Sequence, residues 1–235
     1  MNATSEYSAK RKVTLVQARA DGAARLDPKG APEERIVQAC WSCQGPVGAG
    51  DPFCPSCQAV QPPGQADHFQ RLSLPRGFGI DTAALEKSYF RMQRLLHPDR
   101  FATRTPKEKA LSQQQATSLN DAYETLNDPL ARAAYLAGLM GRDVLKEDGN
   151  APVDPMILME AIEMREALDE AETAEDLGAV TKHTQGEIAD CESELSDAFA
   201  AEDLDRAVTL ITRLKYLRKL ADDTRARRAE LRGRA

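Results

Sequence analysis

The sequence of 235 residues is poor in aromatic side chains and in long apolar runs. Phe, Tyr and Trp together make up 5% of the chain, and no stretch approaches the roughly 18 apolar residues that a membrane-spanning helix requires. The alternation of Val, Ile and Thr with polar residues that is typical of strands is nearly absent. Charged residues reach 29% and the mean hydropathy is −0.50. We therefore expect a mostly α-helical protein that does not bind to or span a membrane.

Positive charge is scarce in one part of the chain. The net charge is −6 overall, but between residues 151 and 200 fourteen acidic residues are accompanied by only two basic ones, Arg165 and Lys182. Binding to nucleic-acid phosphates requires the opposite sign of charge. The sequence therefore argues against nucleic acid as a partner.

A targeting signal is also not evident. Residues 1–38 show little periodicity and contain several helix breakers, so we expect a flexible N-terminal segment. The three basic residues at positions 10–12 precede no apolar core, which argues against a secretory signal. Glu6 and Asp21 fit a mitochondrial transit peptide poorly. We expect a bacterial cytoplasmic protein, or one of the mitochondrial matrix if the source is eukaryotic.

Four of the five cysteines form two Cys-x-x-Cys pairs, Cys40 with Cys43 and Cys54 with Cys57, separated by ten residues. Each pair can bind one metal ion through a tight turn, and two pairs complete a tetrahedral thiolate site. Disulfides or a redox-active pair are the alternatives, but a reducing compartment disfavours structural disulfides. A closed site of this kind is more often structural zinc than iron, although rubredoxin-type iron uses the same four ligands.

The residues around these cysteines predict a small zinc-ribbon or rubredoxin-like knuckle module over residues 39–62. It is too short to build a core of its own, so metal binding would fold it. Gly45 and Gly48 are expected to supply the backbone freedom that such knuckles need. The segment Pro62-Pro63-Gly64 then predicts a linker.

An amphipathic helix is predicted between Asp81, a plausible N-cap, and Leu96, where Pro98 interrupts the helical hydrogen bonds. Its apolar residues recur at helical spacing on one face: Leu85, Tyr89, Met92 and Leu96. Its basic residues lie on the opposite face and are called here the basic stripe: Lys87, Arg91 and Arg94. A second helix is predicted from about Pro106 to Asn127.

Two helices joined by a short polar loop, with His97-Pro98-Asp99 (here the trigger tripeptide) at its tip, resemble the J-domain family. The spacing to Asn120–Pro129 fits that family as well. The resemblance implies that His97, Pro98 and Asp99 trigger ATP hydrolysis by a DnaK-type chaperone and that the basic stripe docks on it electrostatically. Taken alone, the tripeptide would be an ordinary turn and the stripe a solvated helix face.

Three more helices are predicted after a boundary near residues 149–152. The first begins at Asp154-Pro155 and is apolar on two sides. Its core positions are Ile157, Ala161, Met164, Leu168 and Ala171, and its off-core positions are Leu158, Met159 and Ile162. A helix of this kind either binds a partner or is buried between two neighbours in a three-helix bundle.

The second of these helices is predicted over about 174–199 and the third from about Glu202. The third has a core stripe of Leu204, Ala207, Ile211, Leu214 and Ala221, with Tyr216 nearly opposite it and Leu220 nearby. An aromatic residue on that side is a candidate partner contact, although an ordinary exposed tyrosine is the alternative.

A J-region followed by an acidic helical bundle with the sequence of residues 157–170 resembles the HscB family, co-chaperones of iron–sulfur cluster assembly. The cysteine knuckles resemble the extra zinc module of its longer members. The resemblance implies that the bundle binds an IscU-type scaffold protein. The residues at the matching positions are Leu158, Met159, Ile162, Glu163, Arg165, Glu166 and Tyr216, with Ile162 in place of a more usual leucine.

The predicted fold is thus mostly α, with a flexible segment at 1–38, the metal module at 39–62, a helical J-domain at 66–140 and a C-terminal three-helix bundle at 153–233. We expect no enzyme, because the sequence shows no nucleophile with a base and no phosphate-binding loop. The expected partners are a DnaK/HscA-type ATPase chaperone and the IscU-type scaffold. The alternatives are a general J-protein that delivers unfolded clients and a four-cysteine redox or electron-transfer module. The excess of acidic residues disfavours a zinc ribbon that binds nucleic acid.

Overall fold

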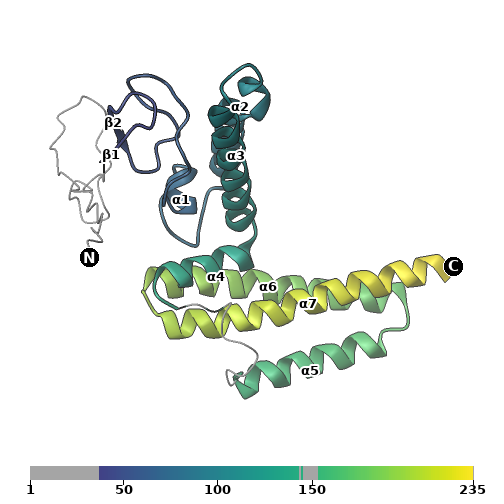
Figure 1. Ribbon diagram of the computed structural model, residues 1–235. Coiled ribbons are helices and arrows are strands. Elements are labelled where there is room, and N and C mark those ends of the chain that lie inside the picture. The colour runs from purple at the N-terminus through teal and green to yellow at the C-terminus, as the bar shows by residue number, and fades with distance from the viewer. Residues whose placement is uncertain (1–36, 143, 145–152, 235) are drawn as a thin grey trace, which may run out of the picture. The chain divides into compact units, whose positions relative to one another are not determined.

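The computed structural model describes residues 37–142, 144 and 153–234 (Figure 1). The elements in chain order are β1 (Val37–Ala39), β2 (Pro46–Gly48), α1 (His68–Arg71), α2 (Thr82–Leu96), the 3-10 helix η1 (Pro98–Phe101), α3 (Pro106–Asn127), α4 (Pro129–Leu139), α5 (Pro155–Glu170), α6 (Ala174–Ala200) and α7 (Leu204–Arg234). The prediction of a mostly helical chain is confirmed. Nearly all of the predicted flexible segment 1–38, and the predicted boundary at 149–152, lie outside the described residues.

The described chain divides into two compact units. The first unit combines the residues up to Asp67 with Met92–Leu119, and the second combines His68–Arg91 with Asn120–Ala235. None of the helices in the described ranges has the length and apolar character needed to cross a lipid bilayer.

In the first unit, β1 and β2 pair antiparallel, with Val37 opposite Gly48 and Ala39 opposite Pro46. The buried apolar residues between Val37 and Val60 are few: Cys40, Val47, Cys54, Ala59 and Val60. Such a small core agrees with a module that needs a metal ion to fold.

The second unit contains α1, most of α2, the end of α3 and the helices that follow. Phe69, Leu72 and Leu85 are fully buried, and the rings of Tyr89 and Tyr123 stack with their centroids 4.2 Å apart. The predicted N-cap of α2 is confirmed, because the Asp81 carboxylate accepts hydrogen bonds from the first-turn N–H groups of α2.

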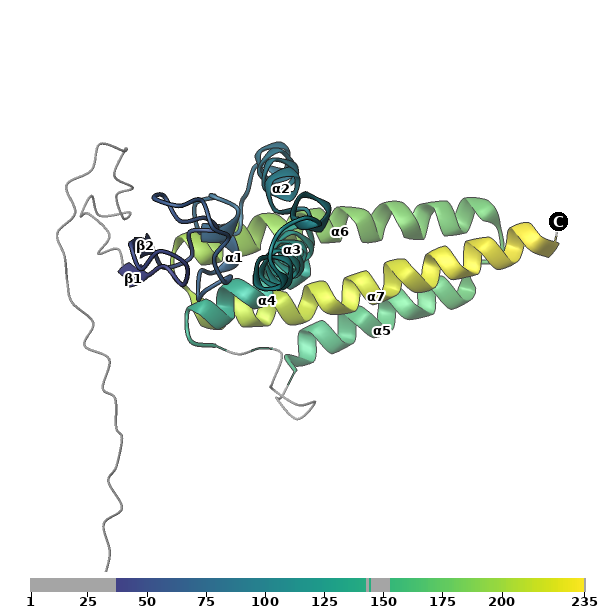
Figure 2. The same ribbon diagram turned by 45° about the horizontal axis from the view of Figure 1, so that its top comes forward.

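The C-terminal helices are arranged around α7. It packs against α4, α5 and α6, and Figure 2 shows α7 between α5 and α6. Asp128 caps α4 by accepting from the Ala131 N–H, and the same carboxylate pairs with Arg218 of α7. The predicted start of α5 is confirmed by the Asp154 cap on Met156 N–H.

One burial prediction is wrong. Leu220 was expected beside Tyr216, away from the core, but it is only 7% exposed. Leu210 and Leu217, which the predicted stripe omitted, are buried too. The reason is that α7 is covered by three helices, so its buried stripe is wider than that of a helix with one packed face.

Candidate functional site

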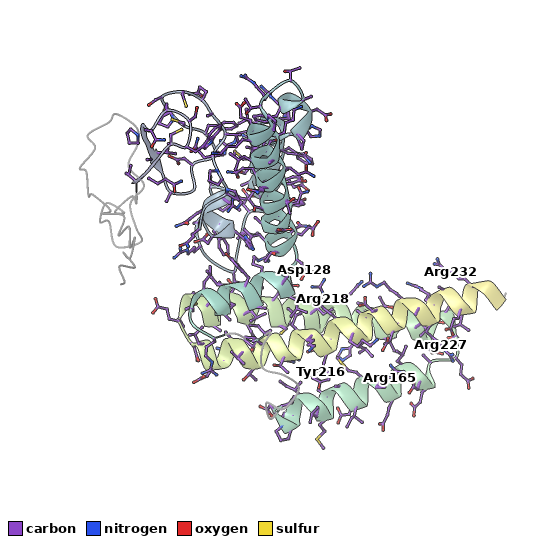
Figure 3. All side chains as sticks on the ribbon, in the orientation of Figure 1. Asp128, Arg165, Tyr216, Arg218, Arg227 and Arg232 are labelled. Carbon is purple, nitrogen blue, oxygen red and sulfur yellow. The ribbon has the colours of Figure 1, made fainter. Side chains whose placement is uncertain are left out.

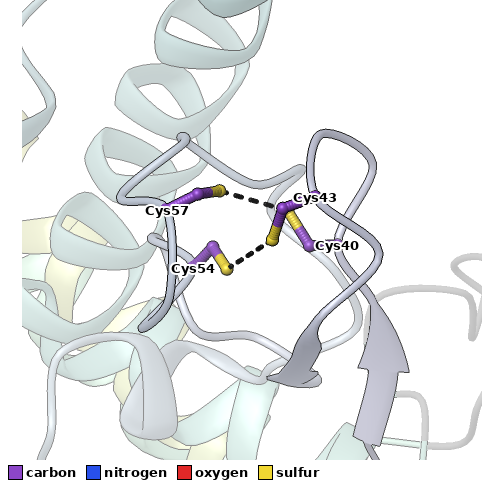
Figure 4. A group of neighbouring side chains, drawn as sticks. All are labelled: Cys40, Cys43, Cys54 and Cys57. Atoms are coloured by element: carbon purple, nitrogen blue, oxygen red, sulfur yellow. Dashed lines mark hydrogen bonds between the residues drawn. The ribbon is translucent and has the colours of Figure 1, made fainter.

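The four paired cysteines converge in the first unit (Figure 4). Their sulfur atoms all lie within 4.8 Å of one another, and the Cys40–Cys57 and Cys43–Cys54 Sγ distances are both 3.7 Å. Tetrahedral zinc thiolates with Zn–S bonds of about 2.3 Å place their sulfurs about 3.8 Å apart, whereas a disulfide needs about 2.05 Å. The four free thiols are therefore positioned to bind one metal ion, as the sequence predicted.

Both Cys-x-x-Cys turns have the same backbone geometry. In the first, the Cys40 N–H donates to the Gly45 carbonyl at 2.8 Å and the Gln44 N–H donates to the Cys40 carbonyl at 3.0 Å. The second turn repeats these two bonds with Cys54, Gln58 and Ala59. The repeated hydrogen bonds hold each cysteine pair with both sulfurs on the metal side.

The expectation for the two glycines is corrected by the structure. The left-handed residues of the knuckles are Gln44 and Gln58, with φ of 62° and 61°, and Gly45 and Gly48 have no positive φ. Gly48 instead lies close to Asp51: a Cβ there would lie 2.5 Å from a carboxylate oxygen of Asp51, so that side chain would have to move. The knuckle tolerates glutamine in the left-handed region because its two turn hydrogen bonds compensate for the backbone strain.

Electrostatics also favour a cation among the thiols. Burial raises the pKa of Cys40, but the N–H groups of Cys43 and Ser42 and the neighbouring thiols lower that pKa to about 6. The N–H of Gly45 lowers the pKa of Cys43, yet the Cys57 thiol, burial and the Cys54 and Cys40 thiols together raise it to about 12. Four thiolates this close repel one another, and a divalent cation removes that repulsion.

The trigger tripeptide forms an exposed and locally ordered turn. The Asp99 N–H donates to Nδ1 of His97 at 3.3 Å, and the Asp99 carboxylate lies 3.5 Å from the same nitrogen. The Asp99 side chain is 90% exposed. Phe101 at the end of η1 is buried, and the Arg100 guanidinium donates to the Arg94 carbonyl. The loop thus presents a carboxylate and an imidazole to solvent on a short anchored helix.

The basic stripe is exposed along α2. Lys87, Arg91 and Arg94 all have exposed side chains. Phe90, beside Arg91, is 49% exposed, and the sequence had not singled it out. This face of α2 combines positive charge with one aromatic ring.

A groove runs between α5 and α7 in the second unit. Its cavity measures about 350 Å³ and its lining includes Leu158, Ile162, Glu166 and Tyr216. Tyr216 on α7 and Arg165 on α5 lie where the two helices face each other (Figure 3). The structure thereby brings together residues that are far apart in the sequence but were predicted to share one surface.

The off-core face of α5 is open to solvent. Leu158, Met159 and Ile162 are 40%, 59% and 58% exposed. Among the described residues no second helix covers this face, so the alternative of a helix buried between two neighbours is wrong. Met159 and Glu163 lie outside the groove lining and are exposed on the same helix.

Arg165 has a structural contact that the sequence did not reveal. Its Nη1 lies 2.7 Å from Oδ2 of Asp223 on α7, and its Nε lies 3.4 Å from Asp169. Lys219 pairs with the same Asp223, and these two basic groups lower the pKa of that carboxyl. Arg165 therefore joins the two helices at the groove.

Arg213 makes a second, less exposed connection. Its guanidinium binds Glu160 of α5 through two hydrogen bonds, at 2.8 and 2.5 Å, and Glu187 of α6 at 2.5 Å. The hydrogen bond from Arg213 lowers the pKa of Glu160, and the same pairing raises the pKa of Arg213. One side chain thus holds three helices together beneath the groove. The sequence offered no signal for it, because its partners lie 53 and 26 residues away.

Glu160→Gln is expected to lower the free energy of unfolding by about 1–3 kcal/mol at pH 7, since it removes the charge of a partly buried bidentate pair. The folded-state pKa of Glu160 lies below its usual 4.5, so this contribution is present above pH 4.5. It is lost as the pH falls through the folded-state pKa. Denaturant unfolding at pH 7 and near pH 3 measures both effects.

Glu170→Gln is the matched control, because Glu170 is exposed on the same helix. It should change the unfolding free energy by less than about 0.5 kcal/mol. Equal effects of the two variants, or a Glu160→Gln effect that does not depend on pH, would contradict the assigned role of the Arg213 network.

Comparison with known proteins gives matches over both helical regions. A family model described as HSCB C-terminal oligomerisation domain matches residues 153–225, and one described as DnaJ domain matches residues 67–135. The human iron–sulfur cluster co-chaperone protein HscB is 35% identical over 199 residues, covering 82% of this chain and 83% of that protein. A co-chaperone protein HscB homolog from Vibrio parahaemolyticus is 33% identical, covering 67% of this chain and 94% of the homolog. The crystal structure of human co-chaperone protein HscB matches with a TM-score of 0.75 at 34% identity, covering 80% of this chain and 97% of that one.

Proposed function

Since the chain belongs to the HscB family of iron–sulfur cluster co-chaperones, we propose that it binds an IscU-type scaffold protein through the α5–α7 groove and stimulates the ATPase of a DnaK/HscA-type chaperone through its trigger tripeptide. The observation that carries the proposal is the exposed apolar face of Leu158, Met159 and Ile162 on α5, in a chain that also presents His97-Pro98-Asp99.

The groove has the composition of a protein-binding site. Leu158, Ile162 and Tyr216 supply apolar and aromatic anchors, and such residues dominate the energy of interfaces when a partner covers them. Glu163 and Glu166 add negative charge on the same helix, which favours a partner with a basic rim. Met159 extends the apolar surface, and Arg165 supports the groove through Asp223 and can still offer its exposed side to the partner.

The trigger loop and the basic stripe fit the ATPase chaperone. The exposed Asp99 carboxylate can accept the paired hydrogen bonds of an arginine, and His97 can donate or accept beside it. Lys87, Arg91 and Arg94 are suited to an acidic surface, where they would speed association and orient the partner. These residues require no chemistry of their own, in keeping with a co-chaperone.

Having both sites in one chain explains how client delivery and ATP hydrolysis would be coupled. A scaffold held on the bundle is presented to the ATPase at a high effective concentration when the J-domain docks. In this scheme, residues 66–140 form the J-domain and residues 153–233 form the scaffold-binding domain. The location would be that of its partners, the bacterial cytoplasm or the mitochondrial matrix.

The direct test is calorimetric titration of an IscU-type scaffold into the intact chain, with ATP hydrolysis by a DnaK/HscA-type chaperone measured in parallel. We expect a 1:1 complex and stimulation that increases further when the scaffold is present. Stimulation without any scaffold binding would instead favour a general J-protein that delivers unfolded clients.

We also propose zinc as the metal of the module at residues 39–62, held by Cys40, Cys43, Cys54 and Cys57. Four thiolates in a closed tetrahedral arrangement are typical of structural zinc, which would act as a cross-link between the two knuckles.

Metal analysis of the purified chain should give one zinc per molecule and a colourless solution. Cys54→Ser should release the metal while leaving the helical signal of α5–α7 nearly unchanged, because that bundle has its own core. A red protein containing one iron per chain would contradict zinc and favour a rubredoxin-type site.

A further inference from the structure

A buried glutamine connects the cysteine site to α3. Gln61 is 1% exposed, and its Nε2 donates to Sγ of Cys40 at 3.3 Å and to the Ala59 carbonyl at 2.8 Å. The main-chain carbonyl of Gln61 accepts from Nε2 of Gln115 on α3 at 2.9 Å. Gln115 is 2% exposed, so this hydrogen bond lies away from solvent. One residue therefore contacts a predicted metal ligand and α3 at the same time.

A second contact joins the cysteine module to α3, two turns earlier on that helix. The Lys107 Nζ lies 4.2 Å from the centroid of the Trp41 ring, a cation–π geometry. Trp41 stands between Cys40 and Cys43, and its Nε1 donates to the Val60 carbonyl at 2.7 Å. The cysteine module thus contacts α3 at both ends of residues 107–115.

The same half of α3 reaches the trigger loop. Ser112, three residues before Gln115 and therefore on the same face, is fully buried. Its Oγ donates to the Leu96 carbonyl at 2.8 Å. That carbonyl belongs to the last turn of α2, whose carbonyls lack helical partners, and Leu96 directly precedes His97. Two sets of hydrogen bonds, joined by residues 112–115 of α3, therefore connect Cys40 to the residue before the trigger tripeptide.

We propose that the four-cysteine site controls the order of the trigger loop, with Gln61 and Gln115 as the positioning residues that connect metal binding to His97-Pro98-Asp99. This proposal rests on the proposed trigger function for its biological consequence, but the coupling itself is a property of the chain. Loss of the metal would leave too small a core to hold the module. Gln115 would then lose a buried partner, which is unfavourable and would loosen the first half of α3.

Hydrogen exchange on the full-length chain, loaded with zinc and after chelation, tests the coupling. We expect amides in residues 97–101 and 107–119 to exchange at least about tenfold faster after chelation, because local opening governs exchange. Amides in the middle of α6 and α7 should be unaffected, which shows that the bundle remains folded. Equal protection of residues 97–119 in both states would overturn the proposal.

Gln115→Ala separates the connection from metal binding itself. The variant should still bind one zinc per chain, yet its trigger-loop amides should exchange as fast as in the chelated parent and change little on further chelation. Gln114→Ala, an exposed neighbour on α3, should behave like the parent. A zinc-loaded Gln115→Ala with parental protection at residues 97–101 would refute the connection.

ATPase stimulation then distinguishes this proposal from the proposed function. Chelation and Gln115→Ala should both weaken stimulation if the trigger assignment is right. Exchange that responds to the metal in a parent that never stimulates the ATPase would support the coupling and refute the proposed function.

Discussion

Asp99→Asn is expected to lower stimulation of the DnaK/HscA-type ATPase by about 30-fold or more, because truncating one partner of a charge pair at an interface costs roughly 2 kcal/mol or more. The change keeps the shape of the side chain and removes its charge. Since that side chain is 90% exposed and contacts its own turn, folding should be unaffected. Single-turnover ATP hydrolysis at saturating co-chaperone measures the effect.

The control for this prediction is Asp121→Asn, which removes the same charge from an exposed position on α3. It should stimulate like the parent. Thermal unfolding and scaffold titration of Asp99→Asn should also match the parent to within about 0.5 kcal/mol. A variant that fails to fold, or one that stimulates normally, would count against the role of Asp99 in the trigger.

The triple variant Leu158→Ala, Ile162→Ala, Tyr216→Ala is expected to weaken scaffold binding by about 100-fold or more. Each anchor that a partner buries contributes on the order of 1–2 kcal/mol, and three neighbouring anchors act on one interface. Two of the three are at least 40% exposed and Tyr216 is 37% exposed, so their loss should affect the helical content little. Calorimetric titration with circular dichroism on the same samples measures both quantities.

Leu139→Ala is the matched control for the groove. Leu139 ends α4, is 41% exposed and is absent from the groove lining, so its truncation removes similar apolar surface elsewhere. It should bind the scaffold like the parent. ATPase stimulation without scaffold should be normal in both variants, because the trigger loop is untouched. Unchanged affinity in a folded triple variant would place the scaffold on another surface.

Local sequence signals predicted the helices well. Asp81 and Asp154, the predicted caps, each bind N–H groups in the first turn of the following helix, and Pro98 and Pro129 stand where the preceding helix has ended. These effects act over a few residues and depend little on the rest of the fold. The four cysteines that are positioned to bind a metal ion were equally easy to predict, because the Cys-x-x-Cys spacing itself defines a bidentate turn.

Burial on α7 was harder to predict, and Leu220 is the example. At about 100° per residue, Leu220 lies about 40° from Tyr216 and about 100° or more from every residue of the predicted core stripe. Whether a position on that side is buried depends on how many neighbouring helices pack against α7. Three helices pack against α7, and no pattern within residues 204–234 predicts its contacts with α4.

The sequence by itself determined the helical class, the helix ends, the two Cys-x-x-Cys turns, the turn at His97-Pro98-Asp99 and the two-faced character of α5, because each follows from residues close together in the chain. Only the tertiary structure decided that the second face of α5 is exposed, that Arg213 and Asp223 hold it against α7, and that Gln61 links Cys40 to Gln115. Those contacts join residues 53 to 58 positions apart in the first two cases and 54 in the third. Long-range pairs of this kind depend on how the helices pack, which local propensity does not specify.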